Sequence, residues 1–393
     1  MMNGQIVVAS IGSVSALGNK RQDILESLQK GICNPIWKEV NQEKIPIIPI
    51  HKKSESTLHE LLEKYPKYKR SDRTAQLAIL AAELCFPALM THSNELEWVI
   101  NAGSSRGATT IWENAYQTFL EKKTVPVKSS PLTTLGNIST HIAQHQKLNG
   151  FLIDHSITCS SGLQAMANGY AWLKSGLTNH FLAVGTEAPL TEFTVAQMKV
   201  LGIYSKDEDS YPCKPCATNL DHTNTFVLGE GAVAIALVNK NEPAEGEVVL
   251  AGMGTASESI PNQTSISPYG EAFRMSMLKA MENAGITPKE IQLVIPHSPG
   301  TYQGDKAEYN ALDSIFDLDQ IKVFNHKYLT GHTLGASGLL GVELGYYLLM
   351  EKLDLQFPYP SLYPNKNIEH PSCVMINSMG FGGNAVSIIL KKI

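Results

Sequence analysis

The sequence predicts an α/β fold built from two duplicated α/β halves, on three observations. Short apolar runs at 99–100 and 182–184 are typical of buried strands. Apolar residues recur with helical spacing after Cys159, at Leu163, Met166, Tyr170 and Leu173. The segment SGLQAMANGYAWL, from Ser161, has a counterpart 176 residues later in SGLLGVELGYYLL. Such a repeat indicates two similar units, each burying a helix with a face of small residues.

The repeat places the boundary between the halves near residue 240. The segment KNEPAEGE, residues 240–247, is polar and rich in turn formers, as a connection should be. We therefore expect an N-terminal half over residues 1–240 and a C-terminal half over 241–393.

The ends of the chain fit the same scheme. The opening MMNGQIVVASIGSVSALGNK has no basic residues before its apolar run, so it predicts a strand and turn, not a signal peptide. A helix is expected to begin near Thr74. The apolar stretch 329–350 contains His332, Glu343 and five glycines, which favours a buried helix over a membrane span.

The amino-acid composition limits the classes of function that the protein can have. The 393 residues are 43% hydrophobic and 18% charged, which is ordinary for a soluble globular protein. A net charge of −5 argues against nucleic-acid binding. Six scattered cysteines do not suggest a disulfide framework, so we expect a reducing cytoplasm. Cys213 and Cys216 form a lone CxxC near His222, but no fourth ligand is evident, and we predict no metal site.

Reactive side chains gather at the predicted junctions of strands, turns and helices. Cys159 lies at the start of a helix, where the positive end of the helix dipole favours the thiolate. His297 ends a predicted strand, and Lys327 and His332 share a later turn. A glycine-rich loop around Phe381 leads into the final strand. A lone cysteine or histidine is more often structural, but together these residues suggest a nucleophilic site.

The motifs around these residues resemble those of β-ketoacyl synthases, the decarboxylating, elongating condensing enzymes of the thiolase superfamily. They follow the family's order, with ITCSSG at Cys159, VLGEGA at 227–232, HxxGTxxGDxxE from His297, KxxxGHxxGAxG from Lys327, and NSxGFGG before the last strand. The likeness runs nearly end to end. It implies a thiolase-like fold in a layered α/β/α/β/α arrangement, with the cysteine in one half and the two histidines and the lysine in the other.

The resemblance also implies roles. Cys159 would be the nucleophile that forms an acyl-enzyme, and the backbone N–H groups of Cys159 and Phe381 would form the oxyanion hole. His297 and His332 would bind the thioester carbonyl of a malonyl unit as it loses CO₂. Lys327 would orient the site electrostatically, and Phe381 would gate the second substrate.

Further roles follow from the same motifs. Asp305 and Glu308 would support the site, although a purely structural Glu308 is about as plausible. Thr301 would bind the carrier arm. No cofactor is implied, because the substrates are carried on phosphopantetheine.

Relatives on the same fold differ at particular residues. A synthase that starts chains from acyl-CoA has Cys, His and Asn, and Asn325 precedes Lys327, but Gly331-His332 matches the elongating pattern. A degradative thiolase has a second reactive cysteine in a glycine-rich setting. Cys373 lacks that setting and is interpreted as a small buried hydrophobic residue.

The chain departs from the family in four places. Gly341 stands where a glutamate is usual, with Glu343 two residues late. Ser298-Pro299 removes one threonine expected to bind the carrier arm, and the final loop is one residue shorter. Arg106 stands where the family often has a small or aliphatic residue at the floor of the acyl pocket. A buried arginine needs a partner, so either it pairs across a subunit interface or the acyl chain is short, polar or conjugated.

The partner implied is an acidic acyl carrier protein. The basic run between 64 and 73 is the densest in the chain and is predicted to dock it, through Lys64, Lys67, Lys69, Arg70 and Arg73. We expect a homodimer, or a heterodimer with a related subunit, and neither nucleic acid nor membrane insertion. The predicted function is a β-ketoacyl synthase of fatty-acid, polyketide or aryl-polyene-type synthesis. The alternatives are a chain-length-factor-like partner subunit and a thiolase-type acyl-CoA acyltransferase.

Overall fold

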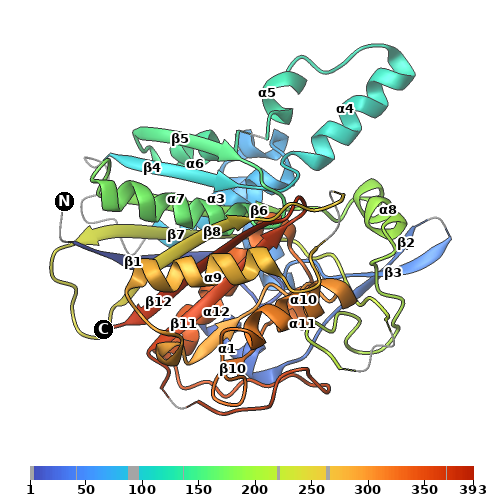
Figure 1. The fold of residues 1–393 in the computed structure, drawn as a ribbon. Helices are drawn as coiled ribbons and strands as arrows, with labels where there is room; N and C mark the ends of the chain where they lie inside the picture. Colours follow the sequence, from blue (N-terminus) through green and yellow to red (C-terminus); the bar gives the residue numbers. More distant parts are fainter. Residues whose placement is uncertain are drawn as a thin grey trace.

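The computed structural model describes residues 4–40, 42–86, 97–135, 137–218, 222–262, 266–368 and 370–393. Within these ranges, ten strands form one sheet in the order β10-β9-β11-β12-β8-β1-β7-β6-β4-β5 (Figure 1). A separate hairpin consists of β2 (Ile36–Val40) and β3 (Glu43–Ile47). The long sheet is best described as two five-stranded units.

The first unit has the order β1-β7-β6-β4-β5. Its strands are β1 (Gln5–Val14), β4 (Trp98–Gly103), β5 (Gly150–His155), β6 (His180–Glu187) and β7 (Gly231–Lys240). Strand β7 runs antiparallel to both β1 and β6, whereas β4 runs parallel to β6 and β5.

The second unit repeats this pattern as β8-β12-β11-β9-β10. Its strands are β8 (Val248–Ser257), β9 (Leu293–Ile295), β10 (Lys322–Val323), β11 (Cys373–Gly380) and β12 (Asn384–Lys392). Strand β12 is antiparallel to β8 and β11, and β9 is parallel to β11 and β10. The identical order and directions confirm the predicted duplication. The units join where Val7 of β1 meets Val249 of β8.

Helices form the other layers. α7 (Ser161–Ser175) and α12 (Ser337–Met350) contact each other and strands of both units, so they form the central layer. α3 (Arg73–Cys85) and α6 (Ile138–Gln146) cover the first unit, and α9 (Glu271–Ala284), with α10 (Tyr302–Asp313) beside it, covers the second. The arrangement is the predicted α/β/α/β/α.

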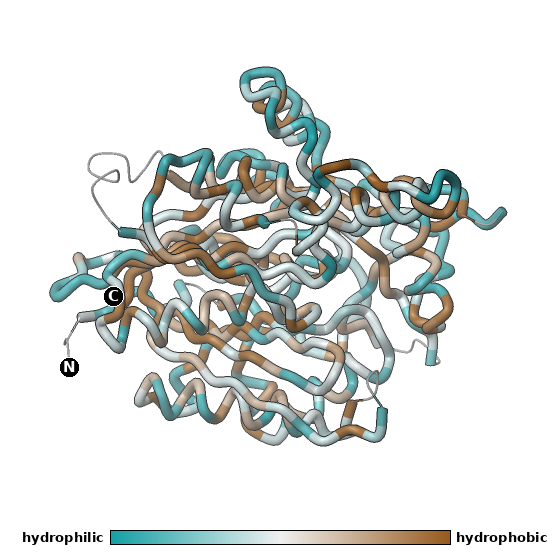
Figure 2. Tube along the Cα trace, turned by 90° about the horizontal axis from the view of Figure 1, so that it is seen from above, coloured by the Kyte–Doolittle hydropathy of each residue, from teal (hydrophilic) through white to brown (hydrophobic). Residues whose placement is uncertain are grey.

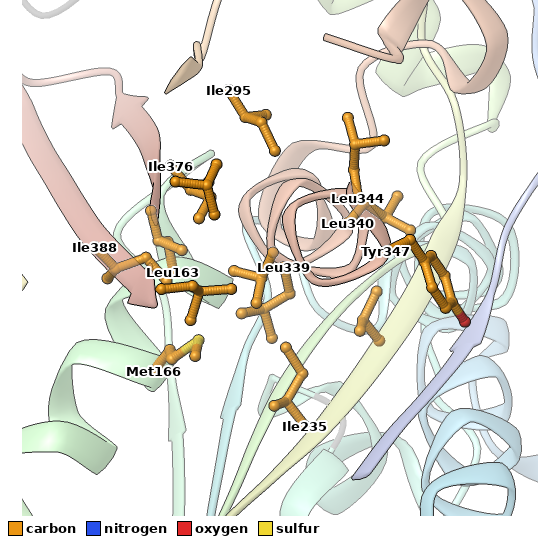
Figure 3. Packing of buried hydrophobic residues seen from close by; sticks show 14 of the residues in the cluster. Leu163, Met166, Ile235, Ile295, Leu339, Leu340, Leu344, Tyr347, Ile376 and Ile388 are labelled. Atoms are coloured by element: carbon orange, nitrogen blue, oxygen red, sulfur yellow. The ribbon is translucent and has the colours of Figure 1, made fainter. Parts of the chain in front are cut away.

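Small residues let the central helices approach closely. A Cβ added at Gly162 would lie 2.5 Å from the carbonyl oxygen of Gly335, and one at Gly338 would lie 2.8 Å from Cβ of Leu163. Figure 3 shows Leu163 and Met166 of α7 directed toward Leu339 of α12, all fully buried. Each such side chain contributes about 1.5–3 kcal/mol through burial. Figure 2 shows the same concentration of hydrophobic residues in the middle of the molecule.

Most of the remaining helices lie at the periphery. They are α1 (Arg21–Lys30), α2 (Lys52–Lys64), η1 (Pro66–Arg70), α4 (Thr109–Lys122), α5 (Ser129–Thr133), α8 (Glu192–Val200) and η4 (Pro288–Glu290). Two short helices, α11 (Lys327–Thr330) and η5 (Leu334–Ala336), are instead buried. α4 and α5 project from the body of the molecule (Figure 1). Within the described ranges, every helix is too short or too polar to span a bilayer.

The predicted elements occur where expected. The apolar runs at 99–100 and 182–184 lie in β4 and β6, and the helical pattern after Cys159 is α7. The helix expected near Thr74 begins at Arg73, because the Asp72 side chain accepts a hydrogen bond from the Thr74 amide and caps it. We propose residues 1–240 and 241–393 as the two halves, since β7 ends at Lys240 and β8 begins at Val248.

Candidate active site

One cavity of about 380 Å³ contains most of the predicted reactive residues. Cys159, His297, His332, Thr301 and Phe381 all line it. The cysteine comes from the turn before α7 in the first half, and the others come from loops of the second half. The rest of the interior lining is apolar, with Met198, Leu201, Ile203, Phe226, Ile266, Phe273, Leu334 and Met379. The two halves therefore contribute different reactive groups to a single site.

The turn that holds Cys159 is fixed by Ser161. The Ser161 hydroxyl accepts from the Ile157 amide at 2.9 Å and donates to the Thr158 carbonyl at 2.6 Å. Thr158 has a φ of 60°, which is unfavourable for a residue with a Cβ. This tight turn places Cys159 two residues before Ser161, the first residue of α7.

The Cys159 thiol is protonated at neutral pH. Burial above all, together with the nearby Glu187 carboxylate, raises the pKa of Cys159 to about 12, against the opposing effect of Lys327. Desolvation of the charged form thus opposes the preference for the thiolate that was expected at the helix start.

Glu187 is a buried carboxylate that the sequence reasoning missed. It accepts backbone N–H groups from Ser105 at 2.7 Å, Arg106 at 3.0 Å and Gly335 at 3.0 Å. Burial raises its pKa to about 7 despite these bonds. The carboxylate ties the loop after β4 to η5, beside the catalytic turn. The sequence did contain a signal for this residue, because Glu187 is a charged residue at the end of the apolar run of β6.

His297 and His332 lie close together. Their ring centroids are 5.3 Å apart and the rings are nearly perpendicular, at 80°. Burial lowers the pKa of both imidazoles well below the usual value, and Lys327 lowers it further. Both rings are therefore neutral at pH 7, and each has one N–H to donate. Phe226 and Phe273 pack near these rings and keep the surroundings apolar.

Lys327 does not line the cavity but lies behind it. Its ammonium donates a hydrogen bond to the backbone carbonyl of His297. Burial lowers the pKa of Lys327, while Glu308 is the main group that opposes this shift. Asn325 holds the same loop, because its side chain accepts the Lys327 amide at 2.6 Å and donates to the carbonyls of Pro296 and Ser298. The Asn325 side chain therefore has a structural role, because its hydrogen bonds go to backbone groups.

Glu308 and Asp305 fix the backbone around His297. Glu308 accepts the His297 amide at 2.8 Å and the Ser298 amide at 2.7 Å. Asp305 accepts the amides of Cys216, Gly300 and Thr301. Burial raises the pKa of both carboxyl groups, that of Asp305 to about 7. These residues position the histidine loop and do not face the cavity.

A side chain outside the predicted set connects the cysteine turn to the Phe381 loop. Asn384 accepts a hydrogen bond from the hydroxyl of Ser160, the residue after Cys159, and donates to the Phe381 carbonyl at 3.0 Å. Phe381 itself is 39% exposed at the cavity mouth. Asn384 occupies this place in a loop that is one residue shorter than in the family pattern.

Arg106 lies near the site but does not line the cavity. Its guanidinium donates to the side-chain oxygen of Gln197, next to the cavity-lining Met198. Its Nε is buried with no hydrogen-bond partner among the described residues. Within those residues no carboxylate lies within 4 Å of the guanidinium. The arginine therefore retains unused hydrogen-bonding capacity.

The structure explains Gly341. A Cβ at this position would lie 3.1 Å from Ile376 Cγ2 and 3.4 Å from Ile295 Cγ2, so a larger side chain would have to displace Ile376. Glu343 does not replace it, because two helical positions turn the side chain by about 200°. Glu343 instead accepts a hydrogen bond from Ser13 at 2.6 Å, and burial raises its pKa to about 7. His332 Nδ1 is left without a partner within the described part of the chain.

The basic run lies on the surface, away from the cavity lining. Lys69 pairs with Glu63 at 2.6 Å, and Lys64 lies 4.0 Å from Glu83. The Lys67 ammonium lies 4.7 Å from the centroid of the Tyr68 ring.

Arg73 differs from the rest of this run. Its guanidinium pairs with the buried Glu230 at 2.7 Å and with Glu55 at 2.6 Å. The charge of Arg73 is therefore already paired within the fold. Arg70, in contrast, is exposed, with no carboxylate within 4 Å among the residues described.

Three further cysteines lie outside the cavity lining. Cys213, Cys216 and Cys373 are buried and unpaired with one another. Burial raises the pKa of all three thiols. Across the described ranges, no three His, Cys, Asp or Glu side chains gather as metal ligands would.

Two comparisons of sequence agree with this geometry. Residues 4–243 match the family described as "Beta-ketoacyl synthase, N-terminal domain", and residues 248–352 match "Beta-ketoacyl synthase, C-terminal domain". The chain is 27% identical to 3-oxoacyl-[acyl-carrier-protein] synthase 2 of Staphylococcus aureus (strain COL), covering 99% of both chains. It is 26% identical to 3-oxoacyl-[acyl-carrier-protein] synthase 1 of Buchnera aphidicola subsp. Baizongia pistaciae, again over 99% of each.

Solved structures share the fold. A β-ketoacyl synthase from Burkholderia phymatum STM815 superposes with a TM-score of 0.82 at 22% identity, over 99% of this chain and 100% of that one. The ketosynthase ApeO, in complex with its chain length factor ApeC from Xenorhabdus doucetiae, gives 0.80 at 22% identity, over 99% and 98%. With family matches over both halves and the thiol and two imidazoles in one cavity, the chain belongs to the β-ketoacyl synthase family.

Proposed function

We propose that this protein is an acyltransferase of the 3-oxoacyl-[acyl-carrier-protein] synthase type that condenses an acyl group with a malonyl group. The observation that carries this proposal is the meeting of Cys159, His297 and His332 in one apolar cavity. A chain-length-factor-like subunit or a thiolase-type enzyme accounts less well for it. The former does not need this set of reactive groups, and the latter needs a second reactive cysteine, whereas Cys373 is buried in β11.

The first half-reaction transfers the acyl group. The Cys159 sulfur attacks the thioester carbonyl, a new C–S bond forms, and the carrier thiolate leaves with the proton that the cysteine loses. The backbone N–H groups of Cys159 and Phe381 stabilise the oxyanion, because fixed donors need no reorganisation as charge develops. Deprotonation occurs with the substrate in place, which agrees with a thiol pKa of about 12 in the free protein.

The second half-reaction forms the carbon–carbon bond. The malonyl carboxylate leaves as CO₂, and the electron pair of the broken bond forms an enolate. The neutral imidazoles of His297 and His332 donate N–H hydrogen bonds to the enolate oxygen. The enolate carbon attacks the acyl-Cys159 carbonyl, and the cysteine thiolate leaves and takes up a proton. Thr301, on the cavity wall, contacts the carrier arm, and Phe381 opens for the second substrate.

Supporting residues act through these groups. Lys327 holds the His297 loop and keeps both imidazoles neutral by its charge. Asp305 and Glu308 fix the same loop through backbone amides. Arg106 limits the acyl chain, either by meeting a partner subunit or by favouring a short, polar or conjugated group.

A mass measurement combined with CO₂ release tests the function. With an acyl-carrier thioester, the intact mass should increase by one acyl group, and Cys159→Ala should abolish this gain while Cys373→Ala leaves it. His297→Ala and His332→Ala should still acylate Cys159 but lose most CO₂ release from malonyl-carrier protein. Acylation that survives Cys159→Ala, or undiminished CO₂ release from either histidine variant, would refute the corresponding role.

The proposal includes a cytoplasmic setting and a second subunit. Helix α4 exposes Trp112, Tyr116, Phe119 and Leu120, and the edge strand β5 exposes Phe151 and Leu152. Exposed apolar side chains on a projecting helix and on an edge strand are features that a partner covers. A second copy, or a related subunit as in the ApeO–ApeC complex, would cover them. Light scattering should give twice the chain mass of 42.9 kDa for the homodimer.

A further inference from the structure

A row of polar side chains crosses the first unit and ends at the turn that holds Cys159. It consists of Asn101 in β4, His155 in β5, and Gln164 and Asn168 in α7. Asn101 is fully buried among the apolar residues of β4, and His155 is half-buried. A buried amide is costly unless it is hydrogen-bonded, so each polar atom of this row needs a partner. We refer to these residues as the polar row.

The direction of the hydrogen bonds in the polar row is fixed from the end at Ser161. The Ser161 carbonyl oxygen can only accept, and His155 Nε2 lies 3.1 Å from it, so Nε2 carries the proton. In a neutral ring Nδ1 then has a lone pair, which accepts from Asn101 Nδ2 at 2.8 Å. Asn101 Oδ1 accepts from Asn168 Nδ2 at 2.9 Å, and Asn168 Oδ1 accepts from Gln164 Nε2 at 2.9 Å. Every link therefore supports a single tautomer of His155.

His155 is neutral and is held in one orientation. Burial lowers the pKa of its imidazole, and the bond to the Ser161 carbonyl only partly opposes this effect. Asn101 Nδ2 also donates to the Ile153 carbonyl at 3.3 Å, which fixes the plane of the amide beside the ring. The backbone of His155 is anchored as well, because its carbonyl accepts the Ser104 amide at 3.1 Å. The Nε2–H group is therefore in place before any substrate binds.

Ser161 connects this fixed group to the nucleophile. The Ser161 hydroxyl makes two of the hydrogen bonds that close the turn before α7, and its carbonyl accepts the His155 donor. The end of β4 packs against the same carbonyl, since a Cβ added at Gly103 would lie 2.4 Å from the Ser161 oxygen. Ser161 is thus held through both its side chain and its backbone, and Cys159 lies two residues before it.

We propose that His155 is a positioning residue for acyl transfer, because its Nε2–H group fixes the first residue of α7 and thereby the sulfur and the backbone N–H of Cys159. This inference rests on the proposed function, in which both groups of Cys159 act on the same thioester carbonyl. A displacement of about 1 Å can slow such a reaction by about a hundredfold. His155 does not line the cavity, so it acts through Ser161 and not on the substrate.

Separate measurements of the two half-reactions test the inference. Acyl transfer uses Cys159, whereas CO₂ release without an acyl donor uses His297 and His332, which other loops hold. In His155→Leu, acylation of Cys159 by a saturating acyl-carrier thioester, followed by intact mass, should slow at least about tenfold. CO₂ release from malonyl-carrier protein should be unchanged. His155→Gln keeps an N–H donor near the position of Nε2 and should recover most of the acylation rate.

A matched variant and a spectroscopic measurement complete the test. His180 is a half-buried histidine of the same unit, at the end of β6 remote from Glu187, and its ring centroid lies 5.3 Å from that of Trp98. His180→Leu should alter neither half-reaction. Histidine ¹⁵N NMR of the parent protein needs no variant and therefore still decides the matter if His155→Leu does not fold. His155 should be the Nε2–H tautomer, and an Nδ1–H tautomer would overturn the inference.

The outcomes separate this inference from the proposed function. Acylation of His155→Leu at the parental rate overturns the positioning role and leaves the proposed function intact. An equal loss of both half-reactions that His155→Gln does not restore has the same meaning, because it indicates a general packing defect. A parent protein that forms no acyl-enzyme with a series of acyl-carrier thioesters refutes the proposed function, and the positioning role with it.

Discussion

The Lys327 ammonium donates a hydrogen bond to the backbone carbonyl of His297, 30 residues earlier in the chain. This contact places a positive charge behind two imidazoles whose pKa values are already lowered by burial. Both rings therefore stay neutral and can donate N–H groups to an enolate oxygen. The relationship gives Lys327 a measurable function that does not require contact with substrate.

Replacing Lys327 with Met should raise the pKa of both histidines, because it removes a nearby positive charge. The acid limb of CO₂ release, where imidazole protonation stops activity, should then move to higher pH. Stability should fall by about 1–3 kcal/mol, because the His297 carbonyl loses its buried donor. A pH profile and histidine NMR titration measure the first effect, and urea denaturation measures the second. An unmoved acid limb would contradict the electrostatic role.

Alkylation of Cys159 should depend steeply on pH. With a thiol pKa of about 12, the thiolate fraction rises tenfold per pH unit throughout the range from pH 6.5 to 9.5. The iodoacetamide rate should therefore increase without a plateau, whereas a free cysteine levels off above its pKa of about 8.5. Site-specific mass spectrometry measures the rate, and Cys159→Ser gives the background from the other five cysteines. A plateau below pH 8 would show that the thiol is activated in the free protein.

Arg106 should set the preference among acyl chains. Arg106→Leu removes a charge whose Nε is buried without a partner in the described chain, so an apolar acyl group should meet less opposition. We expect the ratio of kcat/KM for a ten-carbon over a four-carbon acyl thioester to rise about tenfold or more. Gln197→Leu, which changes only the hydrogen-bond partner, is the matched control and should have a smaller effect. An unchanged ratio in Arg106→Leu would place the guanidinium outside the acyl path.

Carrier docking is best tested at Lys67 and Arg70. Arg73 is unsuitable, because it pairs with the buried Glu230 and its reversal would disturb the fold, and the charge of Lys69 is already paired with Glu63. Lys67→Glu with Arg70→Glu should slow acyl transfer from carrier protein several-fold at low salt, since exposed charges mainly set the encounter rate. Transfer from a small thioester should be nearly unchanged. If both substrates slow equally, the effect is structural, and if neither slows, the carrier docks elsewhere.

The local patterns of the sequence were sufficient to predict the fold class. Apolar runs and helical spacing identified β4, β6 and α7 because these periodicities depend only on nearby residues. The repeat beginning at Ser161 and Ser337 identified the two halves, since a duplicated unit must bury the same helix twice. The positions of Cys159, His297 and His332 were predicted from their places at strand and helix junctions together with motifs that resemble those of β-ketoacyl synthases.

The sequence alone determined the kind of fold and predicted which residues carry the chemistry. The tertiary structure decided how those residues behave, because burial and long-range contacts do not follow from spacing. It raised the pKa of Cys159, against the local helix dipole, by desolvating the thiol. It paired Arg73 with Glu230, 157 residues away, and packed Ile376 so closely against Gly341 that a side chain there would have to displace it. Each of these outcomes depends on groups that are distant in the sequence and meet only in the folded chain.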